Sequence, residues 1–424
     1  MESIWRWRAQ HKSLVNILAL AFVLRLIWIL LVPVQPISDS GVYDLLARNI
    51  ANGTGFAWAP GVPTAHWPVG PAFVYAVFYW IFGLSYVPIL IFHIVISLGT
   101  IWLSMLLAER WFNRTTAIFT GYIMALWPVQ IEFTSVLASE LIFNFLLVAW
   151  LAVWELVTIN RWAKAILLGV IAAATCYIRP VGLLIPIILC VLEMIRARKI
   201  LRPAVSTAII FLVMAILIAP WSIRNTRIFG HFVQISTNGG VNLWEGNNPT
   251  GEGQTEAIPP DALRMQEADR DIYLGKIAKD YIKQYPGRFV VRTLKKAVWL
   301  NDHETIGVHW NILALVRLYG ERVLLPLKIV SDIYWWVVLF FGLIGVCVVF
   351  AQRGIWEAAT SVPIVMWCYF TALYSVFVVQ DRYHFSSLPF IAILAGTALY
   401  ALREYATQRS LRQTARLERE VAPR

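Results

Sequence analysis

The chain alternates between long apolar stretches and shorter polar segments, and this pattern predicts its architecture. A helix needs about 20 mostly apolar residues to cross a hydrocarbon core of about 30 Å, because its backbone amides must be paired internally there. Ten stretches approach that length. They cover residues 13–33, 85–108, 115–130, 136–158, 163–178, 181–195, 204–221, 330–350, 356–379 and 385–403. The predicted fold class is therefore an all-α polytopic membrane protein with about 10 transmembrane helices.

Two segments interrupt the apolar pattern, and both are predicted to lie outside the membrane. The first, 34–84, carries a short amphipathic helix near 43–50. An aromatic helix at 71–82 is too short to cross, so both helices are expected at the membrane interface. The second segment, 222–328, combines Gly- and Asn-rich loops with a polar helix at 261–284. It is predicted to form a small extracytoplasmic domain.

Basic residues indicate how the chain is oriented. With ten crossings, eighteen Lys and Arg lie on the side of the termini, among them Arg6, Arg8 and those of the tail. The short loops of the other side hold only three, Arg48, Arg179 and Arg382. Because positive residues collect in cytoplasmic loops, both termini are predicted to be cytoplasmic in a bacterial inner membrane. The predicted divisions are 1–221 (N-terminal bundle with outer loop 34–84), 222–328 (extracytoplasmic domain), 329–404 (C-terminal helices) and 405–424 (basic cytoplasmic tail).

Composition narrows the class of protein further. Apolar residues make up 59% and charged residues 14% of the chain, which excludes an ordinary soluble globule. The net charge of +11 fits the positive loops and a tail attracted to membrane lipid. The four cysteines lie inside apolar runs, and no phosphate-cradling loop or Rossmann glycine pattern is present. The histidines lack regular metal-ligand spacing, which leaves a divalent metal open but unsupported. No cofactor and no nucleic-acid partner are predicted.

Ionisable side chains cluster at the predicted outer rim of the membrane, where they are costly and therefore informative. They come from six separate segments whose helix ends meet at that face. These residues are Asp39, Asp44, Glu132, Glu140, Arg179, Arg224, Asp381, Arg382 and His384. The sequence therefore predicts a polar site just outside the bilayer.

Each of these residues also has a purely structural interpretation. Asp39 is placed to cap a helix, and Glu140 to interact with a helix dipole. The arginines could extend along the interface, yet arginine on this face runs against the positive-inside bias, and guanidinium binds phosphate in a fork. Arg25, within the first span, is expected to face the interior of the bundle.

Short motifs in a fixed order resemble the GT-C glycosyltransferases, most closely the bacterial branch related to protein O-mannosyltransferases and the lipid A aminoarabinose transferase. The resemblance extends from about residue 13 to 400. Its motifs are Asp39-Ser40 with Tyr43, Gly53-Thr54-Gly55-Phe56, Pro63 to Gly70, Pro128 with Glu140, Arg179-Pro180, Pro220-Trp221 with Arg224-Asn225, Gly246-Asn247-Asn248-Pro249, and Arg382-Tyr383. Relatives often have two adjacent acids where this chain has Asp39-Ser40, so a metal-bridging pair of carboxylates is not expected.

The resemblance implies an enzyme that moves a sugar from a polyprenyl-phosphate donor to an envelope glycan, lipid or protein acceptor on the outer face, by single displacement with inversion. It assigns proton removal from the acceptor to Asp39. It assigns to Glu140 either the binding of sugar hydroxyls or the orientation of the acceptor. The implied donor phosphate-binding residues are Arg382, Tyr383, Arg224, His384 and His66. The implied substrate pocket contains Tyr43, Arg179, Asn225 and Asn247.

Two other classes of protein compete with a transferase. A secondary transporter or lipid-carrier flippase would show paired repeats and polar groups at mid-membrane, but no repeat is visible and the charges gather at one face. A scaffold or lipid-binding partner would not require an acid and several arginines at one rim.

Overall fold

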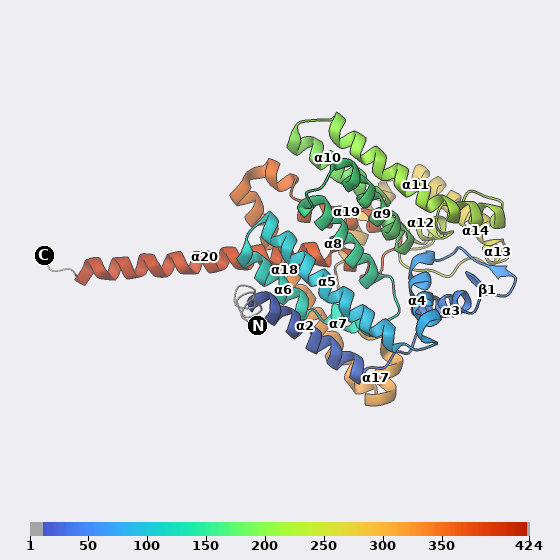
Figure 1. Cartoon of the computed structure of the whole chain (residues 1–424), viewed down its shortest axis with the longest axis horizontal. Coiled ribbons are helices and arrows are strands. Elements are labelled where there is room, and N and C mark those ends of the chain that lie inside the picture. The colour runs from blue at the N-terminus through green and yellow to red at the C-terminus, as the bar shows by residue number, and fades with distance from the viewer. Residues whose placement is uncertain (1–11, 422–424) are drawn as a thin grey trace.

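The protein is almost entirely helical, as predicted (Figure 1). The computed structural model describes residues 12–421, so Arg6, Arg8 and Arg424 lie outside the described residues. The strands that it describes are β1 (Ala57–Ala59) and β2 (Val62–Pro63), which pair antiparallel in the first outer segment. The architecture is that of a polytopic membrane protein.

Each of the ten predicted spans coincides with a helix. These helices are α2 (Lys12–Leu31), α5 (Val87–Trp111), α6 (Arg114–Leu126), α8 (Glu140–Leu156), α9 (Arg161–Ile178), α10 (Ile185–Ala197), α11 (Leu201–Phe229), α18 (Leu324–Ala359), α19 (Val362–Val376) and α20 (Leu388–Val421). In the described chain, seven helical segments are long and apolar enough to cross a membrane alone. An eighth span arises if the bent pair 128–135 and 140–156 is one crossing, whereas α6 and α19 are shorter than a full span.

The buried Arg25 stabilises the break in the chain after α6. Pro128 has no N–H to offer the last turn of α6, which leaves carbonyls there without a helical partner. Arg25 is fully buried and donates hydrogen bonds to the carbonyls of Met124 (3.3 Å) and Ala125 (3.1 Å). It also donates to Ser97 Oγ at 2.7 Å. Arg25 therefore faces the bundle interior, as predicted, and replaces the missing helical hydrogen bonds.

Short helices form the outer segments and the breaks between spans. They are α3 (Ser38–Ala51), α4 (Val69–Phe82), α7 (Pro128–Glu132), η1 (Phe133–Ser135), η2 (Pro180–Leu184), α12 (Gly239–Asn247), α13 (Pro260–Leu263), α14 (Glu267–Gln284), α15 (Pro286–Trp299), α16 (Ile306–Trp310), α17 (Ile312–Tyr319), η3 (Glu321–Val323) and η4 (Asp381–Ser387). The helices predicted near 43–50 and 71–82 are present as α3 and α4. The polar helix predicted at 261–284 begins at Glu267, after the separate α13, and α15 starts at Pro286.

The elements of the segments 34–84 and 222–328 gather at one end of the molecule. In Figure 1, α3, β1, α12, α13 and α14 lie at the right, whereas α2 begins and α20 ends on the opposite side. Helices α12 and α14 share a small apolar core of their own, which includes Val241, Trp244, Leu274 and Ala278. This core is separate from the large one between the membrane helices.

A tight junction fixes α12 to the segment that follows α19. A Cβ atom on Gly246 would lie 2.4 Å from the Phe377 carbonyl oxygen, so only glycine allows this approach. The buried Lys296 donates from Nζ to the carbonyls of Gly246 (3.0 Å) and Phe377 (2.7 Å). Asn247 Nδ2 donates to the Val376 carbonyl at 2.7 Å. These bonds hold the outer elements against the chain just before η4.

Candidate functional site

A cavity of about 540 Å³ lies where the outer elements meet the ends of the membrane helices. Its walls come from α3, the start of α8, the end of α9, α12, the end of α19 and η4. Seven of the eleven residues predicted for the site line it. They are Asp39, Tyr43, His66, Glu140, Arg179, Arg382 and Tyr383.

Asp39 and Arg382 form an ion pair across this cavity, although 343 residues separate them in the chain. Asp39 Oδ2 accepts a hydrogen bond from Arg382 Nη1 at 2.7 Å. Asp39 lies in the first turn of α3 but does not cap it, because Ser40 Oγ makes the local bonds to the backbone of Ile37 (2.9 and 2.7 Å). The carboxylate of Asp39 is therefore directed to the cavity and not to its own helix.

A second pair, Glu140 with Arg179, lies on the same cavity. Arg179 Nη1 donates to Glu140 Oε1 at 2.8 Å, and Ser139 Oγ donates to Glu140 Oε2 at 3.2 Å. Glu140 is the first residue of α8, and Arg179 caps the C-terminal end of α9 in an extended conformation. Pro180 favours that conformation in the residue before it, which ends α9 and directs Arg179 away from its helix. Both pairs are thus presented by helix ends.

The two guanidinium groups contact the same tyrosine ring. The Cζ atoms of Arg179 and Arg382 lie 5.5 and 5.3 Å from the centre of the Tyr383 ring, and Tyr374 stacks on that ring at 4.9 Å. Arg179 bonds Glu140 and Arg382 bonds Asp39 through Nη1 alone, so neither carboxylate uses the Nη2 group of its arginine. Unused guanidinium N–H donors are what an oxyanion such as phosphate requires.

Two predicted donor-phosphate or pocket residues, Arg224 and Asn225, are engaged elsewhere. Arg224 donates to the carbonyls of Thr64 (2.8 Å) and Phe56 (2.9 Å), and also to Asn225 Oδ1 (2.9 Å). Asn225 in turn donates to the carbonyl of Ile235 at 3.2 Å. The Pro-Trp-x-x-Arg-Asn motif therefore fixes the hairpin and the loop after α11, and its polar atoms do not line the cavity.

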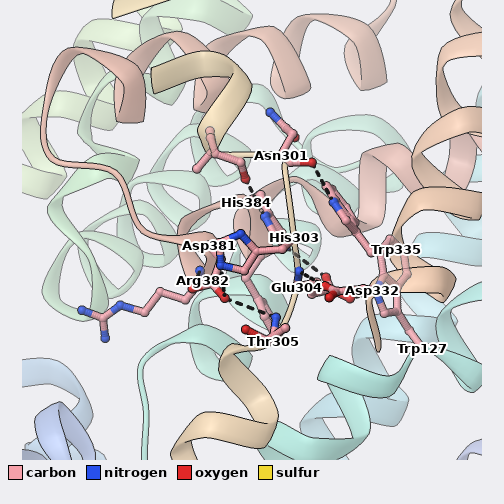
Figure 2. Close-up of polar contacts among 12 residues, drawn as sticks. Trp127, Asn301, His303, Glu304, Thr305, Asp332, Trp335, Asp381, Arg382 and His384 are labelled. Atoms are coloured by element: carbon pink, nitrogen blue, oxygen red, sulfur yellow. Dashed lines mark hydrogen bonds and ion pairs between the residues drawn. The ribbon is translucent and has the colours of Figure 1, made fainter. Parts of the chain in front are cut away.

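His384 and Asn247 also lie outside the cavity. His384 is buried, with Nδ1 2.7 Å from the Leu300 carbonyl oxygen and Nε2 3.0 Å from Glu304 Oε1. Figure 2 shows Arg382 extending away from this cluster, because successive side chains of η4 point in different directions. Asn247 is buried in the junction of α12 with Val376. Both residues hold elements that line the cavity without lining it themselves.

His66 does line the cavity, and one of its nitrogens has no partner. Its Nδ1 atom is buried and makes no hydrogen bond among the described residues. Burial lowers the pKa of His66, so the neutral imidazole is favoured. Glu267 fixes the backbone beside it by accepting hydrogen bonds from Thr64 Oγ1 and the Ala65 N–H, both at 2.7 Å.

The sequence alone did not identify Glu245 as a cavity residue. It lies on α12, in a stretch predicted to be a Gly- and Asn-rich loop, and it lines the cavity with Asp39 and Arg382. Burial raises the pKa of Glu245 to about 7. Its carboxyl accepts a hydrogen bond from the backbone of Glu256 but has no ion-pair partner in the described chain. Ser139, Asn242 and Tyr374 were missed for the same reason, since only long-range packing brings them to the site.

The carboxylates of the cavity are paired with arginine side chains. Asp39 and Glu140 each have an arginine at ion-pair distance, which already compensates their charge. Ser40, in the place of a second acid, turns back to Ile37. Among the described residues no group of three or more His, Cys, Asp or Glu side chains is arranged to hold a metal ion.

Comparisons with known proteins give similarity in structure only. No family model matches the chain, and no curated protein matches its sequence. Among solved structures, the oligosaccharyltransferase AglB from Archaeoglobus fulgidus, in complex with an inhibitory peptide and a dolichol-phosphate, superposes with a TM-score of 0.57 at 14% identity. ArnT from Cupriavidus metallidurans bound to undecaprenyl phosphate superposes with a TM-score of 0.58, also at 14% identity.

The extent of these matches differs between this chain and its neighbours. The AglB match covers 99% of this chain and 53% of AglB, and the ArnT match covers 94% of this chain and 62% of ArnT. The chain thus spans between half and two thirds of the length of either neighbour. Both neighbours are GT-C proteins, and the likeness confirms the fold predicted from the ordered motifs. This chain is a multi-pass membrane protein with the GT-C fold.

Proposed function

We propose that this protein is a glycosyltransferase that takes a sugar from a polyprenyl-phosphate carrier and passes it to an envelope glycan, lipid or protein on the extracytoplasmic face. The observation that carries the proposal is the pair of arginines with unused donors on one cavity. The polyprenyl-type phosphates named in the structures of AglB and ArnT support this donor class.

In the proposed reaction the phosphate of the donor binds the free N–H groups of Arg382 and Arg179. The acceptor oxygen forms a bond to the anomeric carbon while the bond from that carbon to the phosphate oxygen breaks. The electron pair of the broken bond goes to the polyprenyl phosphate, whose charge the two guanidinium groups neutralise. The acceptor proton goes to Asp39, which lies beside Arg382. Attack opposite to the leaving phosphate inverts the anomeric configuration.

The remaining residues of the cavity have supporting roles in this proposal. Glu140 orients Arg179 and is positioned to accept hydrogen bonds from sugar hydroxyls. Tyr383 and Tyr374 provide an apolar surface beside the two guanidinium groups. The positive charge that a metal ion would supply to the phosphate comes here from arginine, so we propose transfer without a divalent cation.

Replacing Asp39 tests the proton transfer. Asp39→Asn is expected to fold and bind undecaprenyl phosphate but to transfer sugar about 10²–10⁴-fold more slowly, because a general base is lost. Transfer is measured with purified protein, polyprenyl-phosphate sugars and membrane-derived acceptors. Asp44→Asn, on the same helix but outside the cavity, is the control. Undiminished turnover in Asp39→Asn would remove Asp39 from the mechanism.

Replacing Arg382 tests the phosphate site. Arg382→Ala is expected to weaken the binding of undecaprenyl phosphate at least about tenfold, since a charge-assisted hydrogen bond contributes about 1.5–3 kcal/mol. Binding is measured by titration of the lipid into protein in nanodiscs. Arg288→Ala, at an exposed position of α15, should leave the affinity unchanged. An equal affinity of Arg382→Ala and the parent protein would contradict the role of Arg382.

A further inference from the structure

The two walls of the cavity differ in chemistry. The wall at the membrane carries both arginine–carboxylate pairs, whereas the wall from residues 234–255 carries amides, hydroxyls and one carboxyl group. Its polar members are Gln234, Ser236, Asn238, Asn242, Glu245 and Thr255. None of the residues that this segment contributes to the cavity is a lysine or an arginine.

Several polar atoms of this wall are available to a ligand. The side-chain amides of Gln234 and Asn242 make no hydrogen bond among the described residues, although the backbone carbonyl of Asn242 accepts from the Val378 N–H at 3.1 Å. Ser236 Oγ donates to Asn238 Oδ1 at 2.9 Å, which leaves the amide nitrogen of Asn238 without an intramolecular acceptor. Amides that offer donors and acceptors together complement hydroxyl groups, which also do both.

Glu245 adds a group with the same dual capacity. Burial raises its pKa to about 7, so near neutral pH its carboxyl is present both as a donor and as an acceptor. Arg382 and Asp39 are close enough to influence Glu245 electrostatically. A charged group beside Glu245 would therefore meet both signs of charge, from Arg382 and from Asp39, and neither a cation nor an anion is favoured there.

We propose that this wall is a subsite for an uncharged, hydroxyl-rich sugar residue, recognised by Asn242, Gln234 and Glu245. The proposal rests on the proposed function and specifies its substrate class. Such a sugar can arrive in two ways, on the polyprenyl-phosphate donor or as the end of a glycan acceptor. The junction of Gly246 and Lys296 with Phe377 holds α12 in place, so the subsite keeps its position next to Arg382.

The test compares neutral sugars with counterparts in which one group is replaced by a charged group. Protein in nanodiscs is titrated with undecaprenyl phosphate, with the same lipid bearing glucose, galactose or mannose, and with its glucuronate and glucosamine counterparts. Free neutral trisaccharides and their uronate-containing forms make up the acceptor arm. We expect one neutral sugar to bind at least tenfold more tightly than its charged counterparts. If the subsite serves the donor, this preference appears with the lipid-linked sugars, and if it serves the acceptor, it appears with the free trisaccharides.

Variants locate the binding in this wall. Asn242→Ala and Glu245→Ala are expected to lower the affinity for the preferred neutral sugar at least fivefold, with the affinity for bare undecaprenyl phosphate retained. Glu252→Gln, an exposed acid of the neighbouring loop that does not line the cavity, should behave as the parent protein.

Several results would overturn the proposal. Equal or tighter binding of a glucuronate or glucosamine form, unchanged sugar affinity in both variants, or binding of a Ser/Thr peptide in place of every sugar would each do so. If sugars fail while bare undecaprenyl phosphate binds, only the subsite is wrong. If undecaprenyl phosphate also fails to bind, the proposed function falls with it.

Discussion

At the scale of single residues, hydrogen bonding determines where the protons lie in the buried cluster of His384, Glu304 and Trp127 (Figure 2). His384 Nδ1 must donate to the Leu300 carbonyl, and Trp127 Nε1 donates to Glu304 Oε2 at 2.7 Å. The contact between His384 Nε2 and Glu304 Oε1 then requires one shared proton. Burial raises the pKa of Glu304 well above its usual value, which favours the neutral acid beside a neutral imidazole.

The neutral pairing leads to a prediction for Glu304. Glu304→Gln can still donate to His384 and accept from Trp127, so its stability is expected within about 1 kcal/mol of the parent. Glu304→Ala leaves both partners unpaired and should lose about 2–4 kcal/mol. Thermal unfolding in detergent measures both variants. Equal damage from Glu304→Gln and Glu304→Ala would show that the pair is instead an ionic imidazolium and carboxylate.

The raised pKa of Glu245 predicts how stability depends on pH. Its usual value of 4.5 rises to about 7 in the folded protein. Between these values the folded state binds more protons than the unfolded state, so this group costs stability as the pH rises from 4.5 to 7. Glu245→Gln should therefore raise the unfolding temperature at pH 8 and change it little at pH 4.5. A gain that is equal at both pH values, or absent, would contradict the assignment, and Glu252→Gln is the control.

The arginine pairs lead to a prediction about metal removal. Because Asp39 and Glu140 are compensated by Arg382 and Arg179, sugar transfer is expected to remain within about twofold after dialysis against EDTA. Transfer is measured before and after chelation, and again after Mg²⁺ or Mn²⁺ is returned. Loss of turnover that a returned cation restores would show that the reaction needs a metal ion.

At the scale of elements, the position of α12 depends on a buried lysine. Lys296 is fully buried and its Nζ contacts three carbonyls, those of Gly246, Val376 and Phe377. No carboxylate pairs with Lys296 among the described residues. Its hydrogen bonds instead join the backbone of α12 to the backbone at the end of α19. The cavity wall that α12 contributes therefore relies on this junction.

Lys296→Met is expected to loosen α12. The side chain keeps its apolar stem but leaves the carbonyls unpaired, at a cost of about 1–3 kcal/mol for each buried group that finds no other partner. Amide hydrogen exchange in residues 239–247 should accelerate at least about tenfold. Lys295→Met, the exposed neighbour on α15, is the matched control. Unchanged exchange in Lys296→Met would show that α12 is held by other contacts.

At the scale of the whole molecule, α3 and α12, which contribute residues to the cavity, lie opposite to the start of α2 and the end of α20 (Figure 1). This arrangement agrees with an even number of crossings. The positive-inside bias then predicts that the cavity faces the exterior and the tail the cytoplasm.

Labelling from one side of the membrane tests that orientation. In a background without the four native cysteines, Glu252→Cys is expected to react with an impermeant maleimide in intact spheroplasts. Thr407→Cys, on the exposed part of α20, should react only after the membrane is opened. The reverse pattern would place the cavity on the cytoplasmic side.

The sequence alone determined the membrane class and the position of the apolar helices. These features follow from local composition and from helix length relative to the bilayer. Tertiary structure decided which of the ionisable residues share a cavity. It paired Asp39 with Arg382, directed Arg224 and His384 into supporting contacts, and brought Glu245 to the site. These contacts depend on how helix ends and loops that are hundreds of residues apart pack together, and a local sequence pattern does not contain that information.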